Sequence, residues 1–393
     1  DQSWSDSGDG RGYAVVFDGT DAGVRTPFDA AWRGVGTQHL DLFGHRVVFP
    51  GDVDGDGDGD LLITAVSAYR PGNQTGAAFL FDVGRSIDGS TDDAGTWFSD
   101  EPGAQLGGAA PAGDLDGDGR ADLVLSATYW GWGIHPGEIR AYRGGALDAR
   151  VAPDAAWIRV AALEPTTPTG ESLAVAELTG DAEPDLVFGE YEWEGRGRVA
   201  VVPGPVADWP THDPILLSGV EDRAVLGTTV ATGDLSGDGV GDLAVSAFGA
   251  AGGGDHRGAV YVWFGPLAAD RTTDDADLVI RGETDHALFG IPTILDHDGD
   301  GALDLAVAAP SDDRGGAARP GLVYVFSGPL GAGEVAPTAA SVVYAGVEPN
   351  DQLGASLAGC DLDHDGDDEL VIGAPGDAYG EARRGRVFVV DGG

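Results

Sequence analysis

One nine-residue pattern recurs along the chain and limits the possible folds more than any other feature. Acidic residues alternate with glycine and other residues, and an apolar strand-like run follows at once, as in residues 52–60 followed by 61–63. Further copies begin at Asp114, Asp234, Asp296 and Asp361, and a degraded copy begins at Glu177. The six copies start 57 to 65 residues apart. One repeated unit therefore accounts for nearly the whole chain.

The alternation of carboxylates in these loops favours a calcium site. In the first copy, Asp52, Asp54 and Asp56 can point at one centre, because Gly55 and Gly57 allow the tight turn. The seventh residue would add a main-chain carbonyl oxygen and the ninth another carboxylate. Such an all-oxygen cage suits Ca²⁺ better than Mg²⁺. Any single copy could be a solvated acidic turn, but five copies in register favour the metal.

The predicted ligands occupy positions 1, 3, 5, 7 and 9 of the five good loops, and about five calcium ions are expected. They are Asp52, Asp54, Asp56, Asp58 and Asp60; Asp114, Asp116, Asp118, Arg120 and Asp122; Asp234, Ser236, Asp238, Val240 and Asp242; Asp296, Asp298, Asp300, Ala302 and Asp304; and Asp361, Asp363, Asp365, Asp367 and Glu369. The copy at Glu177 has Thr179 in the third position and Pro184 in the turn, so we expect it to bind weakly or not at all. The twelfth residue of each good loop is apolar, which excludes the helical EF-hand loop and its glutamate at that position.

The composition narrows the classes of function. The formal net charge is −44, from 66 acidic and 22 basic residues. No basic stripe is present, which argues against nucleic acid as a partner. Acidic loops without metal would repel one another, so calcium binding should be coupled to folding. No apolar run approaches bilayer length, so we expect no membrane span in this chain.

Other residue types add smaller expectations. The chain contains no Met, as expected for a chain that begins inside a longer product or after signal removal. The single Cys360 excludes an internal disulfide framework, and we expect a small buried side chain there. His297 and His364 fall within acidic loops and are expected to face solvent. Because calcium is abundant outside cells, we expect an extracellular or cell-surface location.

Each repeat is predicted to form four short strands separated by turns. A short strand precedes a loop that ends in Phe-Gly or Leu-Gly, and a second strand leads into the acidic loop. A third strand follows that loop directly, and a fourth strand is rich in Val and aromatic residues. This order is typical of one blade of a β-propeller. We therefore expect an all-β propeller of four-stranded blades, with six blades as the first interpretation and seven as the alternative.

The whole chain, residues 1–393, is predicted to be a single propeller domain. Segment 13–35 is expected to supply a strand that closes the ring. Within it, 13–17 and 31–33 are both candidates, and because 13–17 resembles a fourth strand, one strand is left unassigned. The six repeats are expected at residues 30–85, 95–145, 156–204, 214–266, 277–329 and 340–393.

Two repeats carry a specific resemblance. Phe289-Gly290, the 296–304 loop and Ala308-Ala309-Pro310 follow one another in a pattern that resembles the FG-GAP repeats of integrin α-subunit propellers and their bacterial relatives. Residues 353–375 follow the same pattern. The resemblance covers nearly the whole chain and implies a calcium-stabilised propeller used for adhesion or partner binding. Integrin propellers carry seven repeats and only some calcium loops, whereas this sequence has six repeats and five good loops.

The loops after the third strands are predicted to form a partner-binding face. Alternate loops of up-and-down strands lie on opposite faces, so these loops lie opposite the acidic ones. They carry an aromatic residue in five of six repeats, and Arg314 in the sixth. Aromatic residues and Arg dominate binding hot spots, and an aromatic ring can hold a cation; the alternative is that they only pack between blades. The predicted partner-binding residues are Tyr69, Tyr129, Trp130, Trp132, Tyr191, Trp193, Phe248 and Tyr379.

Two classes of function fit these observations. The first is a non-enzymatic, calcium-dependent adhesion or protein-interaction module, whose partner by analogy with integrins is a von Willebrand-like domain. The second is a secreted carbohydrate-binding or polysaccharide-degrading propeller, because aromatic residues also stack on sugars. No Gly-x-Ser-x-Gly elbow and no His-Glu-x-x-His motif occurs in the sequence. Most paired carboxylates are already predicted metal ligands, which favours the first class and leaves a glycan as the alternative partner.

Overall fold

The protein is all-β. The computed structural model describes residues 11–17, 30–38, 41–68, 76–82, 88–92, 94–99, 104–111, 113–128, 137–145, 147, 149–164, 167–206, 213–251, 254–314, 319–376 and 385–392. Short 3-10 turns lie at Pro153–Ala155, Trp193–Gly195, Thr273–Asp275 and Pro337–Ala339. No helix among the described residues is long and apolar enough to cross a membrane. The chain divides into two compact units: unit one comprises residues 1–175 and 205–212, and unit two comprises residues 176–204 and 213–393.

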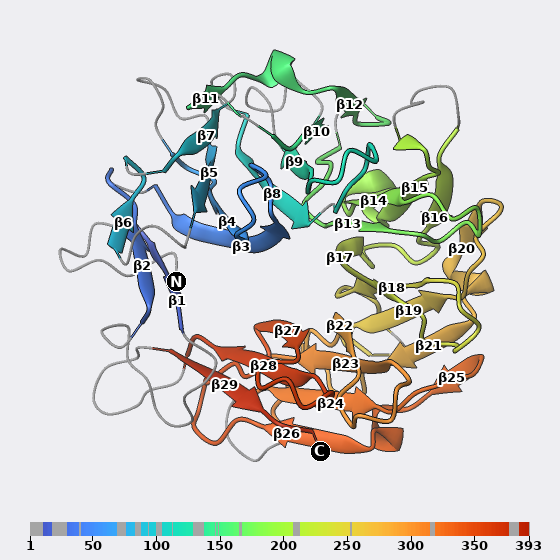
Figure 1. Ribbon diagram of the computed structural model, residues 1–393. Coiled ribbons are helices and arrows are strands. Elements are labelled where there is room, and N and C mark those ends of the chain that lie inside the picture. Colours follow the sequence, from blue (N-terminus) through green and yellow to red (C-terminus); the bar gives the residue numbers. More distant parts are fainter. Residues whose placement is uncertain are drawn as a thin grey trace. The chain divides into compact units, whose positions relative to one another are not determined.

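Unit one contributes three sheets (Figure 1). The sheet β1-β2-β6 contains β1 (Tyr13–Val16), β2 (Trp32–Val35) and β6 (Asp88–Ser90). The sheet β11-β7-β5-β4-β3 contains β3 (Phe43–Gly51), β4 (Asp60–Ala65), β5 (Ala77–Asp82), β7 (Thr96–Ser99) and β11 (Arg150–Val151). The sheet β12-β10-β9-β8 contains β8 (Leu106–Pro111), β9 (Leu123–Ala127), β10 (Glu138–Tyr142) and β12 (Ile158–Ala161).

Unit two contributes four sheets, the first headed by β13 (Leu173–Ala176), where the chain passes from one unit to the other. That sheet continues with β14 (Asp185–Glu190), β15 (Arg198–Val202), β16 (Ile215–Ser218) and β20 (Arg271–Thr272). The next contains β17 (Leu226–Gly233), β18 (Asp242–Ala247), β19 (Ala259–Trp263), β21 (Leu278–Arg281) and β25 (Gly333–Val335). The last two contain β22 (Ile291–Leu295), β23 (Asp304–Ala309), β24 (Leu322–Phe326) and β26 (Val342–Ala345), and β27 (Ser356–Cys360), β28 (Glu369–Ala374) and β29 (Arg386–Val390).

Six of the sheets formed by the described residues are the predicted blades. In each, the strand before the acidic loop, the strand after it and the Val-rich strand lie next to one another in that order. In β22-β23-β24-β26 all neighbours are antiparallel, with Val307 opposite Pro292 on one side and Tyr324 on the other. The outermost strand, β26, comes from the start of the following repeat, as short up-and-down strands allow. The predicted six-bladed propeller is confirmed. Within the described residues, two blades have four strands, three have a fifth strand, and β27-β28-β29 has three.

The strand after each acidic loop forms the core of its blade. Every residue of β4, β18 and β23 is buried, because a central strand is covered on both faces. The twelfth loop residues, which are apolar in the sequence, are at most 1% exposed: Ile63, Leu125, Val245, Val307 and Ile372. Each acidic loop is therefore anchored at its carboxyl end to a rigid strand.

A glycine before the fourth strand of one blade packs against the next repeat. Gly258 has φ +84°, and a Cβ atom there would lie 2.0 Å from the carbonyl oxygen of Phe289. Phe289 is fully buried, and its N–H donates to the carbonyl oxygen of Arg257 at 3.1 Å. The same arrangement recurs at Gly12–Phe43, Gly76–Leu106, Gly197–Leu226 and Gly321–Leu353. The Phe-Gly and Leu-Gly motifs thus join successive blades within each unit.

Both candidate N-terminal segments form strands, and they pair with each other. β1 runs antiparallel to β2, with Tyr13 opposite Val35 and Val16 opposite Trp32. Gly12 contacts Phe43 as the glycine before a fourth strand does elsewhere. β1 therefore occupies a fourth-strand position and β2 the position outside it, which accounts for the strand that the sequence left unassigned.

Two side-chain expectations are wrong. Cys360 is exposed, because β27 is an edge strand whose other residues are also exposed or half-buried. His297 is 2% exposed, and its ring nitrogens lie 2.9 Å from the Tyr344 hydroxyl and 3.2 Å from the Asp368 carbonyl oxygen. The following repeat supplies both partners, so the loop sequence alone could not indicate them. His364 is exposed, as expected.

Candidate metal centre

The first carboxylate of an acidic loop holds the turn together. Asp52 Oδ1 accepts hydrogen bonds from the N–H groups of Gly55 at 2.7 Å and Asp56 at 3.1 Å, and Oδ2 accepts from Gly57 at 2.9 Å. Asp114 and Asp234 accept from the fourth, fifth and sixth residues of their own loops in the same way. The glycines at the fourth and sixth positions have positive φ in all three loops, as such a turn requires.

The ninth carboxylate of each loop accepts main-chain hydrogen bonds that close the loop. Asp242 is fully buried; its Oδ2 accepts from the N–H of Ser236, and its Oδ1 accepts from the N–H of Gly265, both at 2.8 Å. Asp122 and Asp304 each accept from one N–H of their own loop and one at the end of the fourth strand. The ninth residue therefore ties the acidic loop to the body of its blade.

Burial acts against the charge of these ninth carboxylates. It raises the pKa of Asp60 to about 6, although two N–H groups of the loop oppose the shift. Burial likewise raises the pKa values of Asp122, Asp242 and Asp304. A nearby cation would relieve this desolvation cost by favouring the charged form.

The structure brings the predicted ligands together in small groups whose ligand atoms lie within 4.8 Å of one another. In the first two loops the group is formed by positions 1, 3 and 9, and in the 296–304 loop by positions 1, 3 and 5. These groups are Asp52, Asp54 and Asp60; Asp114, Asp116 and Asp122; and Asp296, Asp298 and Asp300. All donors are oxygen atoms, which fits a hard cation such as Ca²⁺.

Several loop oxygens are buried without a hydrogen-bond partner. They are Oδ1 of Asp296, Asp361 and Asp367. A buried carboxylate oxygen without a partner is costly. A hydrogen bond with Asp365 raises the pKa of Asp367 to about 6 and lowers the pKa of Asp365. The donor set of these loops therefore fits a cation that would satisfy the unpartnered oxygens.

The degraded loop keeps the hydrogen-bond frame of the others. Glu177 Oε1 accepts from the N–H groups of Gly180 and Asp181, and Asp185 accepts from those of Leu178 and Gly204. The Thr179 hydroxyl donates to Asp185 at 3.3 Å, and four of the five good loops have a carboxylate in place of Thr179. The turn thus forms in a loop with fewer charges, while its metal affinity stays a prediction.

Two acidic residues near the loops were missed in the sequence. Asp82, at the end of β5, joins Asp56 and Asp58 in a further group. Asp368 accepts from the N–H of Asp296 at 2.9 Å, and its own N–H donates to the Asp296 carbonyl oxygen at 2.6 Å. Strand register could have indicated Asp82, because it pairs with Asp60 across β4 and β5. Asp368 lies 72 residues from its partner, and no local signal marks it.

Only part of the predicted partner-binding face lies within the described residues. Tyr69, Tyr129, Trp130, Trp132 and Tyr379 lie outside them. Tyr191, Trp193 and Phe248 are half-buried. The Trp193 ring lies 4.7 Å from the guanidinium of Arg198, and Phe248 packs against Gly290 of the next repeat. Trp193 and Phe248 therefore have packing roles, and a shared binding role for the set stays a prediction.

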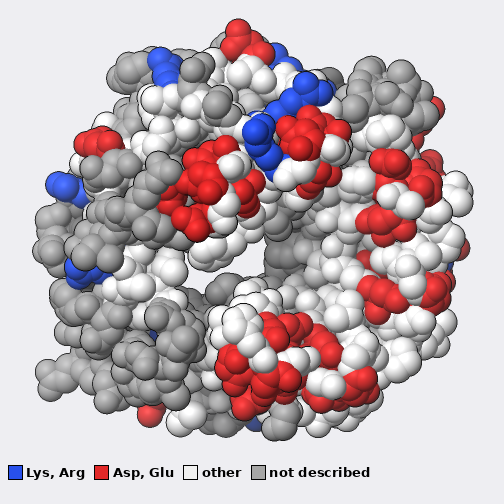
Figure 2. All heavy atoms as spheres, viewed as in Figure 1, with Lys and Arg blue, Asp and Glu red and all other residues white. Residues whose placement is uncertain are grey.

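Negative charge is concentrated in patches. Figure 2 shows Asp and Glu gathered in dense clusters on the face in view, with uncharged surface between them. Much of the first loop is exposed, including Asp54, Asp56 and Asp58. Five carboxylates within nine residues create a strongly negative local potential.

The sequence profile of the FG-GAP repeat matches residues 106–146, 226–263 and 353–390. Each segment spans a Leu-Gly motif, an acidic loop and the strands around them. The chain is an integrin-α-like FG-GAP propeller. The FG-GAP resemblance is thus confirmed, and residues 353–375, one of the two repeats on which it was based, lie within a matched segment.

Relatives of this FG-GAP propeller fall into two groups. It is 33% identical over 212 residues to phosphatidylinositol-glycan-specific phospholipase D of Homo sapiens, which covers 50% of this chain and 25% of that protein. It is 28% identical over 273 residues to Integrin alpha-PS2 of Drosophila melanogaster, a match that covers 63% of this chain and 18% of that protein. It is 30% identical over 233 residues to Integrin alpha-5 of Xenopus laevis, a match that covers 56% of this chain and 21% of that protein. The matched region thus spans at most a quarter of these relatives.

Solved structures add little. An alpha-L-arabinanase of Penicillium chrysogenum complexed with arabinobiose superposes with TM-score 0.46 at 14% identity, covering 90% of this chain and 97% of that one. The Dos1 propeller superposes with TM-score 0.49 at 11% identity, covering 92% and 72%. At these values the likeness supports no statement about function.

Proposed function

We propose that this FG-GAP propeller binds calcium in its acidic loops and acts outside the cell as an adhesion or protein-interaction module. The observation that carries the calcium part is the set of buried, unpartnered oxygens on Asp296, Asp361 and Asp367. In the loops that begin at Asp52, Asp114 and Asp296, three carboxylates have ligand atoms within 4.8 Å of one another. The integrin relatives support the same assignment.

In this proposal the residues of one loop have distinct tasks. Positions 1, 3 and 5 hold the ion with carboxylates, except that Ser236 offers a hydroxyl in the 234–242 loop, and position 7 contributes its carbonyl oxygen. Position 9 links the ion to the blade, because its carboxylate also accepts main-chain N–H groups. Bound calcium supplies positive charge that offsets the repulsion among these carboxylates. Metal binding is thereby coupled to the stability of the blade.

Calcium titration of chelator-treated protein tests the first part of the proposal. Calorimetry should show about five sites, and each increment of calcium should raise the melting temperature. A Glu177→Gln variant should leave the number of sites unchanged, since that loop has the poorest donor set. Failure to observe calcium-linked stabilisation at millimolar calcium would refute the proposal.

The partner is proposed to bind the face opposite the acidic loops. Integrin relatives favour a protein partner, for which a von Willebrand-like domain is the first candidate and a glycan the alternative. The double substitution Trp130→Ala with Trp132→Ala should reduce capture of such a domain at least tenfold while leaving calcium binding unchanged. Surface plasmon resonance with the domain and with a glycan array separates the two partners. Unchanged binding of every probe would remove this face from the proposal.

A second candidate is a propeller that serves an enzyme. It is favoured by the relatives named phosphatidylinositol-glycan-specific phospholipase D. In that case the chain would bind the substrate's glycan or lipid headgroup, or would itself act on a polysaccharide, as the aromatic residues also allow. Incubation with a glycan-anchored protein and with uronic-acid polymers, followed by product detection, distinguishes the candidates. Turnover of either substrate would favour the enzymatic role over adhesion alone.

A further inference from the structure

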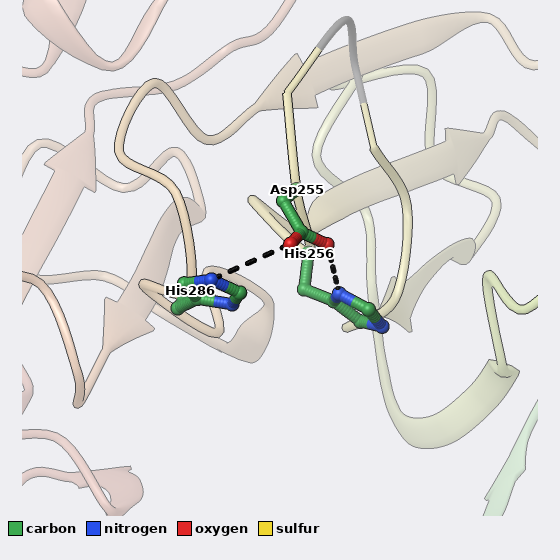
Figure 3. A group of neighbouring side chains, drawn as sticks. All are labelled: Asp255, His256 and His286. Carbon is green, nitrogen blue, oxygen red and sulfur yellow. Dashed lines mark hydrogen bonds and ion pairs between the residues drawn. The ribbon is translucent and has the colours of Figure 1, made fainter.

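A cluster of two histidines and one aspartate lies outside the acidic loops. Asp255 and His256 belong to the connection between β18 and β19, and His286 belongs to the connection between β21 and β22. In Figure 3 the Asp255 carboxylate lies between the two rings, with one dashed line to a nitrogen of each. Its Oδ1 is 2.5 Å from His256 Nδ1 and its Oδ2 is 3.5 Å from His286 Nε2.

The three side chains are within reach of a single ion. Their ligand atoms lie within 4.8 Å of one another. The rings are stacked, with centroids 6.0 Å apart and planes 20° from parallel. All three side chains are between 47% and 63% exposed, so an ion could enter from solvent without displacing packed residues.

The backbone fixes the positions of these side chains. The N–H of His286 donates to the carbonyl oxygen of Asp255 at 2.8 Å, which ties the two connections together. Asp285 Oδ1 accepts from Arg257 Nε at 2.7 Å and from the N–H of Asp255 at 3.3 Å. The one arginine at this site is thus paired with Asp285, and Asp255 Oδ1 and Oδ2 face the two imidazoles.

Both histidines adopt an unusual main-chain conformation. His256 has φ +47° and His286 has φ +60°, in the left-handed region that non-glycine residues seldom occupy. Strain of this kind is often found at binding sites. Here it turns both rings toward one carboxylate, although the two residues lie 30 positions apart in the sequence.

We propose that Asp255, His256 and His286 bind a divalent transition-metal ion of the zinc class. Two imidazole nitrogens and one carboxylate suit Zn²⁺ and its neighbours, whereas Ca²⁺ prefers oxygen donors throughout. Three protein ligands leave one tetrahedral position for water or for a donor atom of a bound partner. The site is chemically distinct from the acidic loops, and it lies at the end of β18 opposite to the 234–242 loop.

Zinc chloride titration in calcium-saturated buffer tests the proposal. If the acidic loops bind calcium, saturating calcium keeps them occupied. If they do not, any weak zinc binding by their carboxylates is the same in the wild type and in the variants. The wild-type protein should show one zinc site that His256→Asn and His286→Asn each weaken at least tenfold. Asparagine is the chosen replacement because it tolerates the left-handed conformation, which separates loss of a ligand from main-chain strain.

Two further measurements make the result decisive. Co²⁺ in place of Zn²⁺ should give visible absorption bands of a four- or five-coordinate site, and these should vanish in the double variant. His45→Asn, a change at a described histidine outside the cluster, should leave both readouts unchanged. Zinc binding that survives in the double variant, or absence of zinc binding by the wild type, would show that Asp255 only accepts hydrogen bonds from the two rings and would overturn the proposal.

Discussion

The ninth carboxylate of each acidic loop combines a structural role with a proposed role in metal binding. Asp242 is fully buried and accepts two main-chain N–H groups, whereas Asp238 in the same loop is exposed. Asp242→Asn places an NH₂ group against one of these donors. We therefore expect it to lower the free energy of unfolding by about 2 kcal/mol even in chelator.

Asp238→Asn is the matched control for this prediction. It should leave stability in chelator unchanged or slightly higher, because it removes one of the mutually repelling charges, and it should weaken calcium binding. Denaturant unfolding of both variants with and without calcium provides the comparison. If both variants lose the same free energy of unfolding in chelator, the buried hydrogen bonds of Asp242 do not stabilise the fold more than the exposed Asp238 does.

A second prediction at the residue scale concerns pH. Burial lowers the pKa of His45, and Arg46 lowers it further, while Glu171 and the Gly107 carbonyl group act in the opposite direction. The folded state therefore binds this proton less readily than the unfolded state, so stability falls as the pH drops below about 6.5. His45→Asn should reduce the loss of unfolding free energy between about pH 7.5 and 5.5. An identical pH dependence in the two proteins, each saturated with calcium, would contradict the assignment to His45.

At the scale of elements, the contact between a glycine and the next Phe-Gly motif is a recurring junction of successive blades. Gly258→Ala would bring a Cβ atom to 2.0 Å from the Phe289 carbonyl oxygen. A loss of about 3 kcal/mol or more is expected, because main-chain atoms must shift in addition to the strain at positive φ.

Gly195→Ala isolates the strain in this comparison. Gly195 has φ +70°, and a Cβ atom added there would meet nothing within 4 Å, so its substitution should cost only about 1 kcal/mol. Thermal melts of both variants in calcium test the difference. If the two substitutions cost the same, the close approach to Phe289 is not what holds the blades together.

The sequence predicted the order of the strands and loops better than the burial of individual side chains. Strand order followed from the fixed sequence of turn, acidic loop and apolar run, and the acidic loops fell where Asp and Gly alternate. Burial of His297 and exposure of Cys360 depend on which neighbouring repeat covers them, and local pattern carries no such information. The Asp255, His256 and His286 cluster escaped notice for the same reason, since two loops of different repeats form it.

At the scale of the whole molecule, charge dominates. A net charge of −44 on 393 residues destabilises the compact state by self-repulsion. In chelator, raising sodium chloride from about 0.05 to about 1 M should therefore raise the melting temperature, because the Debye length shrinks to about 3 Å.

Calcium-saturated protein should respond less to the same change in salt, because bound ions already offset the densest clusters of charge. Calorimetric scans across the salt series measure both responses. A melting temperature in chelator that is independent of salt would show that repulsion between carboxylates is not what limits stability. In that case calcium would act only through local coordination.

Cys360 has a practical consequence. It is the single cysteine of the chain, it is exposed, and it directly precedes the 361–369 loop. A maleimide dye would therefore attach at one known place, beside the buried, unpartnered oxygens of Asp361 and Asp367. If this loop binds calcium as proposed, the emission of that dye would report the occupancy of one loop among five, and the labelled protein would be an optical sensor of a single site without any change to its sequence.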